Sequence, residues 1–427
     1  MQKFCAPHAQ QLGFDMGSVL SALISPDEAI LRVTKTLGFP WRTKREGVEL
    51  LDSLGCKLAY DIKAVSQSPQ WARSTRDGFA VRSSDVYGAS RGSPVFLSLV
   101  GEVNMGSLPS VVIEPETCAA IHTGGILPEG ADAVLMIEDS AMATDLIEVY
   151  TAVQRGENLI QAGEEYKSGD VLLRAGDQLD FASIGLLASM GFGSVDVFGL
   201  KVGVLSTGDE VVDLNEHLKE EEGKIRDINS WTISALLERE GYFVRQFGIA
   251  KDDKGLIESK VNEMLQVCDV IILSGGSSVS AHDHTADVLS QISPPGIIVH
   301  GIRLSPGKPT IISGDKQNCR LAIGLPGHPL SCIAVMYSIV LPVLSALLTG
   351  VPKTQFRRII LPMEYDVYGH TGIEELIPFK LSEDGKVKPM PSKSGYIKTL
   401  RESAGFIRLG ENVETLRKGE EAEVLLW

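Results

Sequence analysis

Positive charge is scarce in this chain of 427 residues. It has 40 Lys and Arg residues against 55 Asp and Glu residues, so its formal net charge is −15. Nucleic acids and anionic membranes are bound through basic surfaces. The charge balance therefore argues against both kinds of partner. It does not exclude small anionic ligands, which need only a local site.

Cysteine is also rare. The six cysteines are scattered, with no Cys-x-x-Cys pair and no histidine at zinc-ligand spacing from any of them. We therefore expect reduced, mostly buried thiols in a cytoplasmic protein. The first 24 residues contain one Lys, one Asp and no long apolar run, so a signal peptide is not expected.

Long hydrophobic runs are missing, with one exception. No charged residue occurs from Leu321 to Pro352, and the stretch 332–348 nearly reaches the length of a membrane span. It contains Pro342, follows a turn-rich segment at 324–329, and has no second candidate span beside it. We expect a helix buried in a large domain, and no membrane contact.

The first half of the chain predicts a few helices around a β-rich insert. Ser25 is a good N-cap for a helix over 26–37, and Gly38 would end it. A second helix is expected over 48–54. From 74 to 150, short β-rich runs alternate with Gly and Pro. The clearest runs are 95–100 and 111–113, and a small helix is expected around 184–190.

Strands alternate with helices from Lys201 to Gly350, which predicts an α/β domain with a parallel sheet and right-handed crossovers. Ligands of such sheets bind in the loops beyond the strand ends. Residues 357–427 carry short strands separated by turns, so a small β-barrel or sandwich is expected there. The expected strands of the α/β domain are 202–206, 242–247 and 270–273, and its expected helices are 231–240 and 254–266.

Two motifs directly follow strands of this domain. Thr207-Gly208-Asp209-Glu210 offers a close backbone approach and two acids. The stretch 274–280, Ser-Gly-Gly-Ser-Ser-Val-Ser, is a candidate nest of backbone N–H groups for phosphate. It matches neither a P-loop nor a dinucleotide fingerprint. Taken alone, each is equally an ordinary glycine-rich turn.

Three further segments are candidates. In His282-Asp283-His284, we favour Asp283 as a metal ligand and the two histidines as surface residues. A stiff turn carries one cation, Lys308, in the segment Ser305-Pro306-Gly307-Lys308-Pro309. The stiffness of the turn lowers the entropy cost of binding an anion. The segments 74–80 and 121–132 each read as a hairpin or loop when taken alone. No Cys-His pair, Gly-x-Ser-x-Gly elbow or His-Glu-x-x-His motif accompanies them.

Taken in order, these motifs resemble the MoeA-type molybdopterin molybdenumtransferases, the family that includes the gephyrin E domain. The similarity extends from about Pro26 to Trp427, and seven weak motifs in one order are specific together. The motifs are Arg76-Asp77-Gly78-Phe79-Ala80; Thr123-Gly124 with 128–134; Thr207-Gly208-Asp209-Glu210; Asp227-Ile228-Asn229-Ser230; Gly275-Gly276 through Asp283; Pro306-Gly307-Lys308-Pro309; and Gly324-Leu325-Pro326-Gly327-His328-Pro329.

The resemblance implies a multidomain α/β fold built of four domains. Its centre would be a three-layer, MogA-like α/β domain with a parallel-rich sheet, accompanied by a β-rich insert and a C-terminal β-barrel. The domain ranges would be 21–73 with 156–198 for a discontinuous helical linking domain I, 74–155 for β-rich domain II, 199–350 for molybdopterin-binding domain III, and 351–427 for barrel domain IV.

The resemblance also implies an activity: insertion of molybdate into adenylylated molybdopterin, with release of AMP and a need for Mg²⁺. It implies a homodimer whose active cleft is shared, so that Asp77 and Thr123 of one subunit serve the other. Contact with the adenylylating MogA-type protein is a further expectation. The matching acidic residues are Asp77, Glu210, Asp227 and Asp283, the last three as Mg²⁺ ligands. The matching substrate-binding residues are Thr123, Gly208, Gly275, Gly276, Ser277, Lys308, Pro309, Ser331 and Thr399.

Several positions depart from the family pattern, and three departures remove a cation. Ile160, Ser305 and the segment 372–375 stand where the family usually has Arg or Lys. Each lost charged contact costs on the order of 1.5–3 kcal/mol. Arg303 and Arg320 are the nearby cations that would have to compensate. Pro378 belongs to the same departure as the 372–375 segment, and the remaining departures are Ser280 and His328.

These departures keep two alternatives open. One is a divergent paralogue that handles another oxyanion, such as tungstate, or a less anionic pterin or nucleotide. The other is a non-catalytic dimeric scaffold, whose sign would be loss of the acidic set, although all four acids are present.

Overall fold

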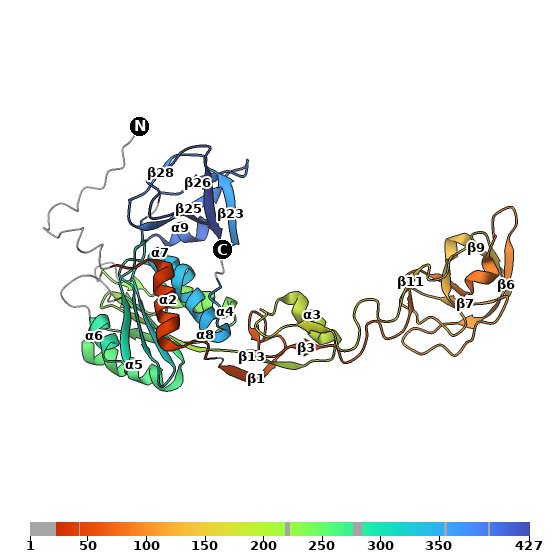
Figure 1. Cartoon of the computed structure of the whole chain (residues 1–427), viewed down its shortest axis with the longest axis horizontal. Helices are drawn as coiled ribbons and strands as arrows, with labels where there is room; N and C mark the ends of the chain where they lie inside the picture. The colour runs from red at the N-terminus through yellow and green to blue at the C-terminus, as the bar shows by residue number, and fades with distance from the viewer. Residues whose placement is uncertain (1–22, 42, 218–222, 276–283, 354–356, 392) are drawn as a thin grey trace. The chain divides into compact units, whose positions relative to one another are not determined.

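The computed structural model describes residues 23–41, 43–217, 223–275, 284–353, 357–391 and 393–427 (Figure 1). The chain forms two compact units. Unit 1 contains the chain up to Tyr60 and again from Gly176 to Trp427, and unit 2 contains Asp61–Ala175. At the boundary within unit 1, the N–H of Leu58 donates to the Asp177 carbonyl (2.9 Å) and that of Gly176 to the Leu58 carbonyl (2.7 Å). The two chain segments that lead to unit 2 therefore leave unit 1 side by side.

Helix α2, Pro26–Leu37, confirms the first predicted helix and both of its caps. Ser25 Oγ accepts a hydrogen bond from the Glu28 N–H at 3.2 Å. Gly38 adopts a left-handed conformation (φ 71°), and its N–H donates to the Thr34 carbonyl. The apolar side of α2 is buried against the central sheet.

The second predicted helix, over 48–54, is wrong. Its start belongs to strand β1, Lys44–Glu49, which pairs antiparallel with β13, Ser194–Phe198. Leu51 and Leu54 in the following turns are 78% and 53% exposed. A helix here would have had no surface on which to bury an apolar side, whereas the strand gains backbone partners.

The central sheet of unit 1 has six strands. The first four in space pair parallel, and the fifth pairs antiparallel with both the fourth and the sixth. The strands that were predicted over 202–206, 242–247 and 270–273 are all present. In spatial order they are β17 (Phe243–Ala250), β14 (Lys201–Thr207), β18 (Val270–Ser274), β22 (Arg320–Leu325), β21 (Ile311–Asp315) and β19 (Pro295–His300).

Helices cover both faces of this sheet, giving the expected three layers (Figure 1). Val202 and Val204 of β14 belong to one core, with α2 and α4, while Leu205 belongs to the other, with α5. This alternation is what a strand buried on both faces requires. The helices are α4 (Asn229–Arg239), α5 (Lys254–Val267), α6 (His284–Ser290), α7 (Pro329–Val335) and α8 (Leu341–Thr349).

The uncharged segment of the sequence is a core helix. Residues Pro329–Thr349 form one continuous helix in which a π-helical turn, Met336–Val340, joins α7 to α8. By length and composition it passes for a membrane span, yet 89% of its most apolar window is buried inside the protein. The prediction of a buried helix is confirmed.

Unit 2 carries the expected β-rich insert. Its main sheet runs β8-β5-β7-β6-β10-β9. The predicted run 95–100 is part of β6, but 111–113 forms no strand. Ile113 lies in a loop instead. Its side chain is buried, and its backbone N–H donates to the Glu129 carbonyl. The strands are β5 (Gly78–Val81), β6 (Val95–Glu102), β7 (Thr117–Ile121), β8 (Ala133–Met136), β9 (Ser140–Ala143) and β10 (Leu146–Val149).

Short ribbons complete both units. In unit 2, β3 (Ile62–Lys63) pairs with β12 (Val171–Leu173), and β4 (Arg73–Ser74) pairs with β11 (Leu159–Ile160). In unit 1, β2 (Lys57–Leu58) pairs with β13, and helix α3, Phe181–Ser189, covers the predicted 184–190 helix.

The C-terminal part is β-rich, as predicted, with one six-residue helix. Its sheet runs β20-β25-β27-β29-β23, and β26 pairs with β25. Strand β20 belongs to the α/β part of the chain but pairs with β25 of the C-terminal part, so this sheet joins the two parts. The elements are β20 (Leu304–Ser305), β23 (Arg357–Pro362), β24 (Val367–Tyr368), β25 (Glu374–Leu381), β26 (Val387–Pro389), α9 (Ile397–Glu402), β27 (Gly405–Leu409), β28 (Thr415–Leu416) and β29 (Glu421–Leu426).

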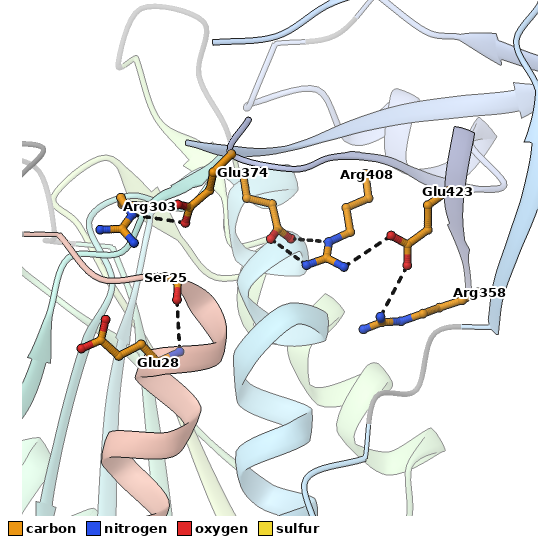
Figure 2. A network of polar contacts seen from close by, with 8 residues as sticks. Ser25, Glu28, Arg303, Arg358, Glu374, Arg408 and Glu423 are labelled. Atoms are coloured by element: carbon orange, nitrogen blue, oxygen red, sulfur yellow. Dashed lines mark hydrogen bonds and ion pairs between the residues drawn. The ribbon is translucent and has the colours of Figure 1, made fainter. Parts of the chain in front are cut away.

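A network of ion pairs supports this junction (Figure 2). Arg408 makes a two-pronged contact with Glu374 (3.0 and 2.9 Å) and a longer one with Glu423 (3.4 Å). Arg303, just before β20, pairs with Glu411 at 3.2 Å. The two-pronged geometry fixes the register of β25 against β27.

Candidate active site

Asp227 is anchored where β14 and β18 end. Its carboxylate accepts hydrogen bonds from Ser206 Oγ (2.8 Å), Ser230 N–H (3.1 Å) and Ser230 Oγ (2.5 Å). Ser206 Oγ also lies 3.2 Å from Ser274 Oγ, so both strand ends join the network. Asp227 is only 8% exposed and lies two residues before the start of α4, where the helix dipole favours a negative charge.

Two predicted glycines lie at these strand ends, where there is little room for a side chain. Gly275 has φ +104°, and a Cβ there would lie 2.3 Å from the Thr207 carbonyl oxygen. Gly208 has φ +145°, and a Cβ there would lie 2.9 Å from the Glu210 carboxylate. Both positions therefore require glycine. Gly276 and Ser277, the rest of the predicted phosphate nest, lie outside the described residues.

Glu210 is exposed beside two further acids, Asp209 and Asp252. The N–H of Asp252 donates to Asp209 Oδ1 at 3.3 Å. Loss of surrounding water and the negative charges of Asp209 and Glu210 raise the pKa of Asp252. Carboxylates crowded in this way favour a nearby cation.

A complete metal cage is absent from the part of the chain that the structure describes: no three His, Cys, Asp or Glu side chains there are placed to share an ion. Asp283, the third predicted ligand, lies outside that part. Mg²⁺ is commonly held by one or two carboxylates together with substrate phosphates and water. Glu210 and Asp227 fit that mode of binding.

Asn229 was not singled out from the sequence, although its motif was. Its Nδ2 donates to the Gly327 carbonyl at 2.7 Å, which ties α4 to the loop after β22. Its buried Oδ1 has no partner among the described residues. A motif shows which residue types are present but not which backbone groups they reach, so the sequence carried no signal for this bond.

A second cluster of predicted residues lines a pocket of about 560 Å³ in unit 1. The loop 305–309 brings Lys308 and Pro309 to it, and the start of α7 brings Ser331. The rest of the lining comes mainly from β25 and from Met390 and Ser394. Thr399 does not line this pocket and lies in α9, 7% exposed. The structure thus brings three of the four predicted residues together here.

The pocket is not rich in cations. Lys308 is the one cation and Glu375 the one carboxylate among its described lining residues. The Arg303 guanidinium forms an ion pair with Glu411 and donates a hydrogen bond to the Leu23 carbonyl. Arg320 pairs with Asp269 and lines a different cavity. Neither arginine replaces the cations that Ser305 and the 372–375 segment lack.

In unit 2, the predicted pair Asp77 and Thr123 is in direct contact. The Thr123 N–H donates to Asp77 Oδ1 at 2.8 Å, and this bond holds the pKa of Asp77 below its usual value. His122, which the sequence did not single out, lies 3.5 Å from the same oxygen and 3.2 Å from Glu102. Ile160 lies in β11 and is 41% exposed.

Three family models match the chain in sequence order. "MoeA N-terminal region (domain I and II)" matches residues 24–191, "Probable molybdopterin binding domain" matches 203–346, and "MoeA C-terminal region (domain IV)" matches 361–427. Together they cover the α/β crevice, the Lys308 pocket with its wall on β25, and the Asp77 pair.

Individual relatives agree with these matches. A protein of Methanocaldococcus jannaschii named for molybdopterin biosynthesis is 30% identical over 90% of this chain and 92% of its own length. The molybdopterin molybdenumtransferase of Haemophilus influenzae is 33% identical over 76% of this chain and 78% of its own length. A solved structure of a molybdopterin biosynthesis MoeA protein from Pyrococcus horikoshii superposes with a TM-score of 0.75 at 32% identity, covering 95% of this chain and 99% of that one.

Proposed function

The chain belongs to the family of MoeA-type molybdopterin molybdenumtransferases, and we propose that it transfers molybdenum from molybdate to adenylylated molybdopterin with release of AMP. The observation that carries the proposal is the Asp227 network at the strand ends of the molybdopterin-binding domain, where Glu210 follows β14. An open α/β sheet binds its ligand at this edge.

Mg²⁺ is part of the proposal, with Glu210, Asp227 and Asp283 as the residues that would hold it. When bound, it would neutralise negative charge on the phosphates of the substrate. Asp227 is held in one orientation by Ser206 and Ser230, so its position is set before substrate arrives. Gly208, Gly275 and Gly276, together with Ser277, would allow the substrate to approach the protein backbone closely.

The Lys308 pocket would receive an oxygen-rich part of the substrate. Lys308 is mounted between two prolines, and Ser331 is 5% exposed at the start of α7. Both groups donate hydrogen bonds to anionic oxygens. We assign Pro309 to shaping of the loop and Thr399 to support from α9.

A homodimer is proposed as the working form, in which Asp77 and Thr123 of one subunit serve the site of the other. Helix α3 supports an interface between copies. Its sequence, Phe-Ala-Ser-Ile-Gly-Leu-Leu-Ala-Ser, is almost wholly apolar, yet Leu187 is its one buried residue and Phe181 is 84% exposed. An apolar surface of this kind is typical of a protein interface. Contact with an adenylylating MogA-type protein belongs to the same proposal, as does a cytoplasmic location.

The direct test is AMP release from molybdopterin-AMP by the full chain, with and without molybdate and Mg²⁺. We expect release to need both, and Glu210→Gln to lower it at least tenfold. Asp213→Asn, an exposed acid nearby, is the matched control and should leave the rate unchanged. Release that is independent of molybdate, or equal in Glu210→Gln, contradicts the proposal.

One observation favours a second candidate, a paralogue that acts on another oxyanion such as tungstate or on a less anionic substrate. The pocket balances Lys308 with Glu375, instead of gathering cations. Replacing molybdate by tungstate in the same assay separates the two candidates, because the second predicts equal or faster AMP release.

A further inference from the structure

Three strand ends of unit 2 meet at one edge of its main sheet. Strand β7 lies between β5 and β6. Asp77 directly precedes β5, which runs antiparallel to β7, and Glu102 ends β6, which runs parallel to β7. His122 directly follows β7. The topology therefore places one histidine between two carboxylates, one from each neighbouring strand.

The three side chains are in contact through both ring nitrogens. His122 Nδ1 lies 3.5 Å from Asp77 Oδ1, and His122 Nε2 lies 3.2 Å from Glu102 Oε1. An imidazole that carries both protons donates from both nitrogens, and a carboxylate only accepts. The ring can therefore bridge the two acids and keep their charges apart.

His122 is the cation available to Asp77. Within the described residues, Asp77 has no ion pair with a lysine or an arginine. Arg73 of β4, the strand bonded to the same loop, donates instead to the Gly124 carbonyl at 2.8 Å. The Thr123 N–H and the His122 ring both contact Oδ1, so Oδ2 is the oxygen left for a ligand.

Exposure decides what such a bridge can do. The side chains of Asp77, His122 and Glu102 are each close to 60% exposed, between 58% and 59%. Ion pairs at this exposure contribute little to stability. The contacts can still select one orientation of a carboxylate that a ligand can reach, and a fixed orientation lowers the entropy cost of binding and reaction.

We propose that His122 is a positioning residue, which bridges Asp77 to Glu102 and fixes the Asp77 carboxylate beside Thr123 with Oδ2 turned toward the substrate. The inference rests on the proposed function in taking Asp77 as a residue of the substrate site. It adds Glu102 as the second support of the ring. Neither His122 nor Glu102 needs to touch the substrate.

The first test is NMR of the full chain and needs no turnover. The Thr123 amide reports the ionisation of Asp77, whose pKa is lowered by the Thr123 N–H and further by His122. In His122→Phe, which keeps a ring but loses both nitrogens, the acid midpoint of this amide should rise toward the ordinary Asp value. His300→Phe, at an exposed histidine of unit 1, should leave it unchanged. An unchanged midpoint in His122→Phe overturns the proposal.

The second support is tested on the ring itself. In the full chain with 15N-labelled histidine at pH 6, the ring resonances of His122 are identified by their absence in His122→Phe. They should move in Asp77→Asn and again in Glu102→Gln. Asp145→Asn, at an exposed acid of the same unit, should leave them in place. Ring resonances that ignore Glu102→Gln would show that no bridge exists.

The consequence for the reaction is tested by AMP release. We expect His122→Phe to lower the rate about threefold, in line with the strength of exposed ion pairs. Glu102→Gln should lower it by a smaller factor in the wild type and have no effect in His122→Phe, because a bridge can be lost only once.

A purely structural role would make the two losses add. Equal effects of Glu102→Gln in both backgrounds therefore contradict the positioning role, as does a wild-type rate in His122→Phe. Absence of AMP release from the wild type would refute the proposed function, whereas the NMR results would still decide whether the bridge forms.

Discussion

Asp77 shows how a single backbone N–H sets the chemistry of an exposed acid. The Thr123 N–H stabilises the charged form of the carboxylate, so the folded pKa of Asp77 lies below its unfolded value. The sign follows from linkage: the contribution to stability is present above the unfolded pKa and is lost as the pH falls through the folded pKa.

We therefore expect the amide resonance of Thr123 to shift on acidification with a midpoint below the usual range for Asp. In Asp77→Asn this titration should vanish. NMR spectra recorded from pH 7 to pH 2 make the measurement, with Asp145→Asn, an exposed acid of the same unit, as the control. A midpoint at the ordinary Asp value in the wild type would contradict the role of the bond.

Gly275 is a second residue whose role follows from geometry. An alanine there would place its Cβ 2.3 Å from the Thr207 carbonyl oxygen at a φ of +104°. We expect Gly275→Ala to lower the free energy of unfolding of unit 1 by about 1–3 kcal/mol, measured by denaturant titration. Gly193→Ala, where a Cβ meets nothing within 4 Å, is the matched control. Equal effects of the two variants would show that the crowding is relieved at no cost.

At the scale of elements, α3 combines an apolar composition with a single buried residue, Leu187. We expect Phe181→Glu to convert the proposed dimer to a monomer, because the charge would be buried at the interface. Sedimentation measures the change. Phe96→Glu, at another exposed phenylalanine, should leave the association state unaltered. A dimer that persists in Phe181→Glu places the interface on a different surface.

Elements whose signals are local could be predicted from the sequence. Ser25 and Gly38 act within one turn of α2, and the buried strands β14 and β18 are continuous apolar runs. The helix predicted over 48–54 failed because the choice was made by pairing with Val195 and Ser194, far along the chain. Propensity is a weak guide where a distant strand supplies the backbone partners.

The same division applies to the site. The glycines after β14 and β18 were found because ligand loops follow strand ends in parallel sheets. The bond from Asn229 to Gly327 and the position of Glu375 and Lys308 on one pocket could not be predicted, since both depend on how separate elements pack together. No local rule relates the register of β25 to β20.

At the scale of the whole molecule, the two units have separate hydrophobic cores. We expect scanning calorimetry to show more than one unfolding transition. Gly78→Ala should lower only one of them, because a Cβ at Gly78 would lie 1.9 Å from the Leu135 carbonyl oxygen, within unit 2. Gly275→Ala should lower the other. A single transition that moves in both variants would mean that the units unfold cooperatively.

The paired crossing segments have a consequence for protein engineering. Leu58 is bonded to Asp177 and Gly176 within unit 1, while the Ala175 N–H donates to the Asp61 side chain within unit 2. Unit 2 thus begins and ends its share of the chain at one place. We expect that residues 61–175 can be replaced as a block, by a short turn or by the corresponding segment of a relative, without cutting through the core of unit 1. Chimaeras made at this junction would allow unit 2 of one relative to be combined with unit 1 of another.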